Sequence, residues 1–336
     1  MSMVEVTRDL PRSSDGLPME WIDAPFGPFF PGLPGGLLLT LTLDGDTVAG
    51  ADARSLTGNG RLIHTSPLDT PSFVERLTNM DPLAPVAYGL LACQALEDAA
   101  SVNVPADMAC ARAAALERER ISSHLGWLAL FGQQTGFGWL MQRAASLQLA
   151  SLHADLGQVM ALKPAIHALI KRLQRTPLLK SRTAGIGRLS PDMALHGPVA
   201  RAAGIGDDAR NRDGIFTMLG FTMATRKEGD VLARLQVRLD EMTHSLSLIE
   251  AAGAMAVPIP SPVGDVSANG MAVVETPRGP ARLQLTLDKG QVTAAQLETP
   301  STSHLGLVEA LTAQQALGDA LTAVVSLDLS PWEVRQ

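Results

Sequence analysis

The chain has very few of the residues that build redox and metal centres. Among its 336 residues it contains two cysteines, Cys93 and Cys110, and one tyrosine, Tyr88. The two cysteines stand far apart, so they resemble neither a disulfide framework nor the paired ligands of a structural zinc site. We expect both to be small buried core residues. The composition therefore excludes a metal centre that is held by four thiolates.

Long apolar runs and basic clusters are also missing. No stretch reaches about 18 apolar residues free of charges, and the first residues lack the apolar run of a signal peptide. The formal net charge is -7, and no Lys/Arg cluster is longer than Lys171-Arg172, which argues against a nucleic-acid surface. These absences predict a cytoplasmic protein that neither inserts into a membrane nor binds nucleic acid.

The composition is that of a folded protein. Of its residues, 46% are hydrophobic and 18% are charged, which is enough apolar material for a large core. The polar first residues predict a flexible N-terminal tail over residues 1–22. Nothing in the remaining sequence demands a boundary, so we expect a single domain over residues 23–336.

Turn signals predict a β-hairpin near the start of the chain. Residues 23–36 are rich in Pro and Gly and are expected to form an irregular loop. Leu37–Leu43 and Thr47–Ala53 flank Asp44-Gly45, a pattern typical of a hairpin.

A second hairpin is predicted late in the chain. Apolar and polar residues alternate over Arg282–Val292, around the turn Asp288-Lys289-Gly290. This hairpin can pair with Met271–Glu275 to form a small sheet.

Helical patterns fill the sequence between the hairpins. The clearest one repeats apolar residues at a 3-4 spacing, which is typical of a helix that packs in an antiparallel bundle; its members are Leu232, Leu235, Leu239, Met242, Leu246 and Ile249. The predicted helices span Pro82–Ala100, Pro105–Gln133, Gly138–Arg175, Glu228–Met255 and about Ser303–Leu321. The predicted fold class is mainly α with a small β part (α+β), a central long-helix bundle with antiparallel hairpins in the N- and C-terminal parts.

Four segments carry a family signature in a consistent order. They are Leu-Glu-Arg-Glu-Arg-Ile-Ser-Ser-His-Leu over 116–125, Leu-His-Gly-Pro-Val-Ala-Arg-Ala-Ala-Gly over 195–204, Glu-Gly-Asp over 228–230 and Val-Glu-Thr-Pro-Arg-Gly over 274–279. Together they resemble the superfamily of nickel-iron hydrogenase large subunits and the 49 kDa subunit of respiratory complex I. The resemblance covers roughly residues 24–336 and implies a hydrogenase-large-subunit-like fold.

The complex I branch of this superfamily is not matched at its quinone site. Where that branch resembles Gly-Pro-Gln-His-Pro-x-x-His-Gly, residues 27–35 place Phe30 and Pro34 at the two histidine positions. The tyrosine that the same branch places before its first bundle helix falls at Pro82, and Tyr88 stands elsewhere. The resemblance therefore implies that the proton donors of a quinone-reducing site are lost.

The hydrogenase branch is not matched at its metal site. Its two Cys-x-x-Cys pairs fall at degenerate ligand positions, which are Asp81, Ala84, Ser330 and Glu333. Soft redox metals in such a site need thiolate ligands, and carboxylates are hard oxygen ligands. We therefore expect no nickel and no ordinary catalytic centre.

Residues that lie over the iron in hydrogenases have counterparts in this chain. Pro-Arg-Gly over 277–279 and Thr-Pro-Ser-Thr over 299–302 resemble motifs that donate hydrogen bonds to cyanide ligands of the iron. Charged and hydroxyl donors suit such anionic ligands. The alternatives are that Arg278 pairs with Glu275 or a backbone carbonyl, and that the hydroxyls cap a nearby helix. The implied cyanide contacts are Pro277, Arg278, Ser301 and Thr302.

A hydrogenase-like chain without metal ligands resembles the hydrogenase expression/formation protein of the HupK and HoxV type. That resemblance implies a non-catalytic scaffold or chaperone in the maturation of a nickel-iron hydrogenase, which handles an Fe(CN)2(CO) unit transiently. Its partners would be maturation proteins and the hydrogenase large or small subunit. One alternative is a structural, ligand-free subunit of a redox complex. Another is an enzyme with a new carboxylate site at Asp81 and Glu333.

Three polar residues stand together on the second predicted helix. Arg120 and His124 are one turn apart, whereas Glu119 does not share a face with His124. We expect these side chains to form a buried polar network that ties the bundle together, and a proton relay is the alternative.

Two further groups have open roles. The aromatic residues Phe26, Phe29 and Phe30 alternate with prolines, and they predict either an exposed docking loop or a cap on the bundle. His64 and His196 stand in predicted loops, and neither is assigned a metal.

Overall fold

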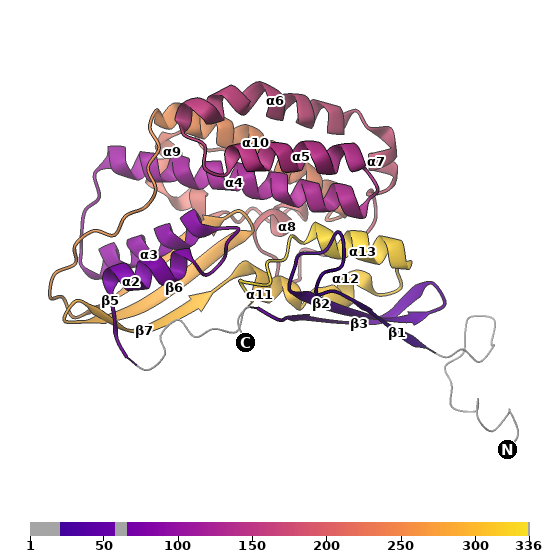
Figure 1. Ribbon diagram of the computed structural model, residues 1–336, viewed down its shortest axis with the longest axis horizontal. Coiled ribbons are helices and arrows are strands. Elements are labelled where there is room, and N and C mark those ends of the chain that lie inside the picture. Colours follow the sequence, from indigo (N-terminus) through magenta and orange to yellow (C-terminus); the bar gives the residue numbers. More distant parts are fainter. Residues whose placement is uncertain (1–20, 58–65, 335–336) are drawn as a thin grey trace, which may run out of the picture.

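The computed structural model describes residues 21–57 and 66–334, whose helices and strands form two layers (Figure 1). Long helices make the upper layer in this view, and two sheets with shorter helices make the lower one. Most of the predicted tail over residues 1–22 lies outside the described residues, as does His64. Ile22 already belongs to the first strand.

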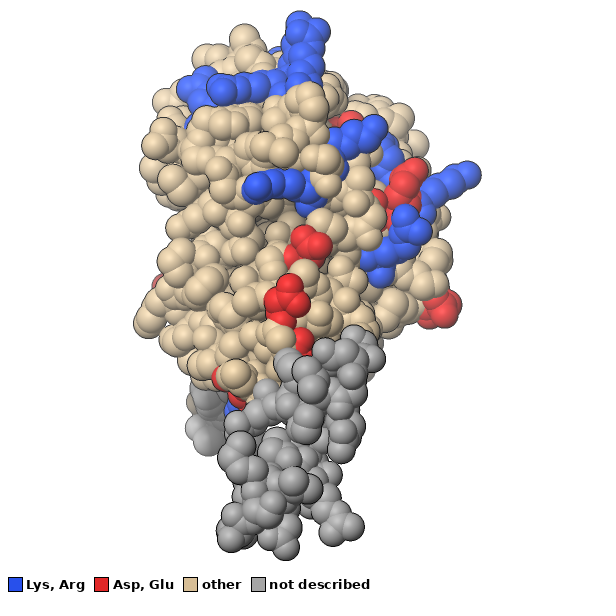
Figure 2. Space-filling view, turned by 90° about the vertical axis from the view of Figure 1, so that its right-hand side faces the viewer, with Lys and Arg blue, Asp and Glu red and all other residues tan. Residues whose placement is uncertain are grey.

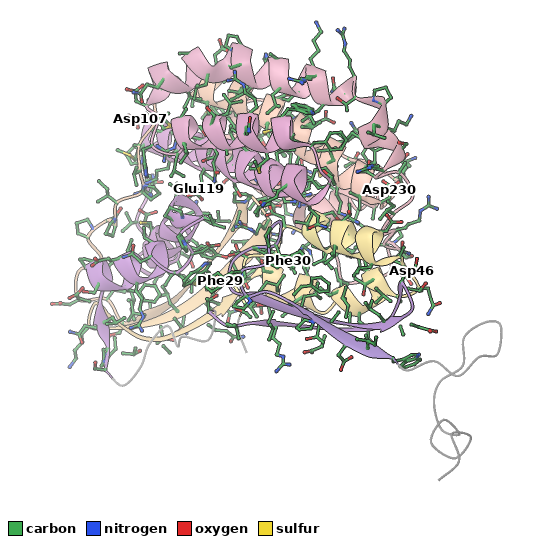
Figure 3. All side chains as sticks on the ribbon, turned by 45° about the vertical axis from the view of Figure 1, so that its right-hand side comes forward. Phe29, Phe30, Asp46, Asp107, Glu119 and Asp230 are labelled. Atoms are coloured by element: carbon green, nitrogen blue, oxygen red, sulfur yellow. The ribbon has the colours of Figure 1, made fainter. Side chains whose placement is uncertain are left out.

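The upper layer is the bundle that the sequence predicted. Its helices are α4 (Ala106–Gln134), α5 (Gly138–Ser151), α6 (Leu156–Gln174) and α10 (Val231–Ala252). Leu239, Met242 and Leu246 of α10 are buried in the core that these helices share, which confirms the 3-4 seam. α10 begins after Asp230 (Figure 3), whose carboxylate accepts a hydrogen bond from the Ala233 amide at 2.8 Å.

The segment predicted as one helix, Gly138–Arg175, is two helices. α5 ends at Ser151, and α6 starts at Leu156. A reciprocal capping box opens α6: the Gln158 amide donates to the Asp155 carboxylate at 2.8 Å, and the Asp155 amide donates to the Gln158 side chain at 2.9 Å. This exchange satisfies free amide groups at the helix start, so it favours a new helix over a continued one.

The first predicted hairpin belongs to a three-stranded antiparallel sheet in the order β1-β2-β3. Leu37, Leu39 and Leu41 alternate into the helical core, as expected for a strand with one buried face. The prediction that residues 23–36 form only a loop is wrong at its start, where Pro25 lies in an edge strand that tolerates proline. The strands are β1 (Ile22–Phe26), β2 (Leu37–Asp44) and β3 (Thr47–Ser55).

The second predicted hairpin belongs to a four-stranded antiparallel sheet in the order β4-β7-β6-β5. Its strands are β4 (Leu68–Asp69), β5 (Ala268–Thr276), β6 (Gly279–Asp288) and β7 (Gln291–Glu298), and α2 (Thr70–Thr78) and α3 (Pro85–Ala99) pack on it. At Gly270 an added Cβ would lie 2.1 Å from the Ala95 carbonyl oxygen. The glycine therefore allows β5 to approach α3 closely.

The C-terminal part is more broken than predicted. Instead of one helix over Ser303–Leu321 it forms α11 (Pro300–Leu305), α12 (Val308–Thr312) and α13 (Leu317–Ser326). Gln314 has a φ of 60°, which a right-handed helix does not contain. Its amide donates instead to the Val48 carbonyl of β3 at 2.9 Å. Pairing with a distant strand therefore interrupts the helix.

Short helices fill the connection between α6 and α10. They are α7 (Pro177–Ser181), α8 (Gly197–Ala202), a 3-10 helix (Ala209–Arg212) and α9 (Gly214–Met218). Elements of this length are too short to show a helical period in the sequence, so they were not predicted. The mainly α fold class with small antiparallel sheets is confirmed. The single domain over residues 23–336 stays a prediction.

The charged side chains are unevenly placed on the face that Figure 2 shows. Lys and Arg gather on its upper part, where Figure 1 places α6 and α7, and acidic side chains lie lower. Within the described ranges, no helix combines the length and the apolar character that crossing a membrane requires.

Candidate functional site

Four buried charged side chains meet at the turn between β5 and β6. Arg278 of this turn lies among Asp81, Asp328 and Glu333. Its Nη1 is 3.4 Å from Asp81 Oδ2 and 3.5 Å from Glu333 Oε1. Its Nε donates to the Asp328 carbonyl oxygen at 3.1 Å. We call these four residues the central cluster, and it unites two of the degenerate ligand positions with the predicted arginine.

Hydroxyl groups around α11 hold the C-terminal segment in place. The Ser301 hydroxyl donates to the Glu333 carboxylate and accepts from the Ser330 amide at 3.0 Å. The Thr299 hydroxyl donates to the Glu333 carbonyl oxygen at 2.6 Å and lies 2.9 Å from that of Thr302. The alternative that these hydroxyls cap the helix is wrong, because the N-cap is Thr299 and no side chain makes a capping bond.

Tyr88 also belongs to the site, although the sequence interpretation placed it elsewhere. It is fully buried on α3, and burial together with the charges of Glu333 and Asp81 raises the pKa of its phenol. Burial also raises the pKa of Glu333, while Arg278 opposes that shift and Asp81 adds to it. The sequence signal that could have located Tyr88 is Pro85, a typical first residue of a helix. A helix that starts at Pro85 holds Tyr88 in its first turn.

A glycine lets α8 pack directly against the Arg278 turn. Gly197 has a φ of +56°, and an added Cβ would lie 2.2 Å from the Arg278 carbonyl oxygen. Only glycine fits both the conformation and the space. The preceding amide, that of His196, donates to Nε2 of His304 at 3.2 Å. His196 therefore has a structural contact beside the site.

The central cluster does not fit an Fe(CN)2(CO) unit. Its ligand positions Asp81 and Glu333 already face the Arg278 guanidinium, and their carboxylates are hard oxygen ligands, which do not suit a soft iron centre. Within residues 21–57 and 66–334, no group of three or more His, Cys, Asp or Glu side chains is arranged to hold a metal ion. Arg278 makes the backbone contact that the sequence offered as an alternative, not a pair with Glu275. The cyanide contacts of Pro277, Arg278, Ser301 and Thr302 stay a prediction.

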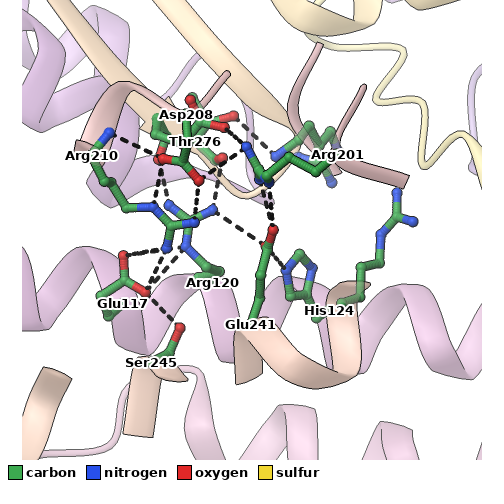
Figure 4. Close-up of polar contacts among 12 residues, drawn as sticks. Glu117, Arg120, His124, Arg201, Asp208, Arg210, Glu241, Ser245 and Thr276 are labelled. Carbon is green, nitrogen blue, oxygen red and sulfur yellow. Dashed lines mark hydrogen bonds and ion pairs between the residues drawn. The ribbon is translucent and has the colours of Figure 1, made fainter. Parts of the chain in front are cut away.

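A second set of buried charges, the Arg201 network, lies between α4, α8 and α10 (Figure 4). Arg201 contacts Glu241 at 2.7 Å, Glu275 at 2.8 Å and Asp208 at 3.0 Å. Burial lowers the pKa of Arg201, but the three carboxylates outweigh burial and the pKa is raised. One guanidinium thus joins α8, α10 and β5. The other members are Glu117, Arg120, His124, Arg210 and Ser245.

Arg120 and His124 confirm the predicted buried network. Nε2 of His124 lies 2.9 Å from the Glu241 carboxylate. Arg120 donates to the carbonyl oxygens of Glu275 at 2.6 Å and Thr276 at 3.0 Å. α4 is thereby tied both to α10 and to the strand that leads into the Arg278 turn.

A cavity of about 550 Å3 opens beside the central cluster. Arg278 and Asp328 form part of its wall, and Val86, Trp127 and Leu329 contribute to a largely apolar lining. A cavity of this size, with few polar groups in an apolar wall, is typical of a small-molecule site.

Glu119 lies on α4 (Figure 3) and lines this cavity, and among the described residues the hydrogen bonds of its carboxylate do not reach the Arg201 network. Its carboxylate accepts hydrogen bonds from the Val86 and Ala87 amides, at 2.6 and 2.9 Å, where α3 begins. Burial raises the pKa of Glu119 to about 7, although these two hydrogen bonds oppose the shift. The prediction that Glu119 joins Arg120 and His124 is wrong, because adjacent helical residues point in different directions.

We expect Glu119→Gln to flatten the dependence of stability on pH. Burial raises the pKa of Glu119 from its ordinary value of 4.5 to about 7 in the folded protein. Between these two pH values the folded state therefore keeps a proton that the unfolded state releases. The free energy of unfolding therefore falls as the pH rises from about 4.5 to about 7, by about 3 kcal/mol through this residue. Urea denaturation at about pH 5 and about pH 8 measures the change.

The control for this prediction is Glu309→Gln, which changes an exposed glutamate of α12. It should keep the wild-type difference between the two pH values. If Glu119→Gln keeps it as well, Glu119 is not the titrating group.

The aromatic and cysteine predictions have mixed outcomes. Phe26 and Phe30 pack edge to face with ring centroids 4.9 Å apart and contact the core, as the cap alternative requires. Phe29 is 87% exposed, as a docking residue would be (Figure 3). Cys93 and Cys110 are buried as predicted, and burial raises the pKa of Cys93 to about 12.

Comparisons with known proteins point to respiratory complexes. Residues 154–264 match the family described as respiratory-chain NADH dehydrogenase, 49 Kd subunit. An NADH-quinone oxidoreductase subunit from Desulfotalea psychrophila is 28% identical, over 93% of this chain and 96% of its own. An NAD(P)H-quinone oxidoreductase subunit from Prochlorococcus marinus strain MIT 9515 is 28% identical over 68% of each chain. The same fold occurs in the structure of the membrane-bound sulfane sulfur reductase, an archaeal respiratory membrane complex. The matching chain of that complex has a TM-score of 0.84 and 20% sequence identity, and the match covers 94% of this chain and 98% of that one.

These relatives contradict the predicted maturation role. They are subunits of quinone oxidoreductases and of a respiratory membrane complex. The predictions of a hydrogenase maturation scaffold, of maturation proteins as partners and of a cytoplasmic location are therefore wrong. Missing thiolates motivated them, but that loss does not distinguish a maturation protein from a subunit that holds no metal. Over residues 154–264 the chain is thus similar to the 49 kDa subunit family of the respiratory chain, and over nearly its whole length it is similar to a subunit of an NADH-quinone oxidoreductase.

Proposed function

We propose that the chain is a metal-free subunit of a multi-subunit respiratory redox complex. The similarity to a subunit of an NADH-quinone oxidoreductase over nearly the whole chain carries this proposal. The fold shared with a chain of a respiratory membrane complex supports it. Its partners are then the other subunits of that complex, and it reaches the membrane through them.

We also propose that the chain performs no metal catalysis of its own and carries no Fe(CN)2(CO) unit. The central cluster supports this part, because Arg278 pairs with the carboxylates at two positions where the resemblance expects metal ligands. Because the guanidinium already contacts these carboxylates, a metal bound to them would leave the buried Arg278 without its partners. The contribution of the chain to the complex is then structural.

We propose that a partner subunit covers the rim of the cavity. Leu83 and Val257 both line the cavity, and they are 41% and 57% exposed. Apolar side chains around the mouth of a cavity are typical of surfaces that another protein covers. A subunit placed there would close the cavity.

Affinity purification of the full chain from gently solubilised membranes tests this proposal. We expect it to copurify with other subunits in an assembly much larger than one chain. Leu83→Glu should reduce this copurification, because it places a charge in the interface. Leu178→Glu changes an exposed leucine of α7 and should have no effect. Recovery of the chain only as a free monomer from the soluble fraction would contradict the proposal.

A further inference from the structure

Arg118 is a buried arginine with few partners. It lies on α4 and is 9% exposed. In the part of the chain that the structure describes, its one hydrogen bond runs from Nη1 to the Ala154 carbonyl oxygen at 3.3 Å, and its Nε has no partner. The buried Arg234, in comparison, donates to three acceptors. Most donors of the Arg118 guanidinium are therefore unused.

Arg118 also lacks a matched negative charge. No carboxylate of the described residues forms an ion pair with it within 4.0 Å. The neighbouring Glu119 turns its oxygens to the amides at the start of α3. Burial lowers the pKa of Arg118, and Glu119 opposes the shift without forming a pair. A buried cation without a paired anion is costly, so a bound anion would relieve a cost that the fold already carries.

The guanidinium stands in the wall of the cavity beside the central cluster. Ser122, Ser123, Gln148 and His153 share that wall with Arg118. The Ser123 hydroxyl is also without a hydrogen-bond partner, and the residue is only 9% exposed. Two unpartnered donors, both nine-tenths buried, thus stand in one cavity whose remaining lining is largely apolar.

We propose that this cavity binds an amphipathic anion, with its carboxylate or phosphate group at Arg118 and its apolar chain along the apolar wall. An anionic oxygen would accept from the guanidinium and from the Ser123 hydroxyl, and it would supply the missing negative charge. Trp127 and Leu130, which also line the cavity, would contact the chain of the ligand. A neutral ligand such as a quinone would leave Arg118 unpaired. The inference does not depend on the assembly proposed above.

Isothermal titration calorimetry of the full chain tests the inference with three probes of equal chain length: dodecanoate, dodecyl phosphate and dodecanol. We expect at least one anion to bind about 10- to 100-fold more tightly than the alcohol, which is the range that a charge-assisted hydrogen bond gives. The tighter of the two anions identifies the natural headgroup as a carboxylate, as in a fatty acid, or a phosphate, as in a phospholipid.

Variants separate the headgroup site from the apolar wall. Arg118→Met should remove the preference for anions, Arg118→Lys should keep most of it, and Arg143→Met, at an exposed arginine of α5, should leave it unchanged. Ala129→Trp changes no charge but fills the cavity, so it should block all three probes and serves if Arg118→Met does not fold. The proposal is overturned if dodecanol binds as tightly as both anions, or if a short-chain quinone binds more tightly than either anion and with equal affinity to Arg118→Met.

Discussion

Arg201→Met is expected to lower the free energy of unfolding by about 3–5 kcal/mol. The guanidinium of Arg201 stands within 3.0 Å of carboxylates from Glu241, Glu275 and Asp208, and all four side chains are buried. Methionine keeps the apolar stem but leaves three buried carboxylates without this cation. Because a folded domain is stable by only about 5–15 kcal/mol, the loss is a large part of the total.

Urea denaturation followed by circular dichroism measures this effect. The matched control is Arg212→Met, because Arg212 pairs with Asp207 at 3.0 Å while its side chain is 79% exposed. An exposed pair of this kind contributes at most about 1 kcal/mol. If Arg201→Met costs no more than the control, the Arg201 network does not hold α8, α10 and β5 together.

Arg278→Met is expected to lower the free energy of unfolding by about 3–5 kcal/mol near pH 8 and by clearly less near pH 5. Burial raises the pKa of Asp328 and of Glu333, and Arg278 opposes both shifts. Without the guanidinium, these two carboxylates would therefore bind protons still more tightly in the folded state than in the unfolded state. The raised folded pKa values mean that stability falls as the pH rises and recovers on acidification. Urea denaturation at the two pH values measures the difference.

Two further variants sharpen this test. Arg282→Met removes an arginine of β6 that is half exposed and 4.0 Å from Glu298, and it should have little effect. The double variant with Arg278→Met and Glu333→Gln should recover part of the loss near pH 8, since one unpaired carboxylate is gone. A loss of equal size at both pH values would show that unpaired carboxylates are not its cause.

The long elements could be predicted because their patterns are local and periodic. The seam of α10 runs over about five turns, and Asp230 is the N-cap of the helix. The spacing of Asp155 and Gln158 is also that of a capping box, which marks a helix start. It was not used to divide Gly138–Arg175, because the helical pattern continues across it. The break at Gln314 could not be foreseen, because it depends on pairing with Val48 of a strand far away in the sequence.

The candidate site was predicted only in part, because some of its contacts join segments that are far apart in the sequence. The resemblance named Asp81, Arg278 and Glu333 as positions, and the structure brings them together. It gave no reason to expect Asp328, which accepts a hydrogen bond from Arg278 through its backbone carbonyl. It also gave no reason to expect Arg118, which among the described residues makes one hydrogen bond and leaves its Nε without a partner. Contacts between segments set both features, and no spacing within one segment reports them.

The central cluster also has a consequence for how the protein is made. Its members come from near the start and near the end of the chain, and the Ser55 hydroxyl donates to the Pro331 carbonyl oxygen at 2.6 Å. While a ribosome is still adding residues before Asp328, the nascent chain lacks two of the carboxylates, those of Asp328 and Glu333, that lie near Arg278 in the folded protein. Contacts between residues so far apart in sequence form slowly. The central cluster therefore closes only after this segment is translated, and until then the unfinished chain is exposed to misfolding and aggregation.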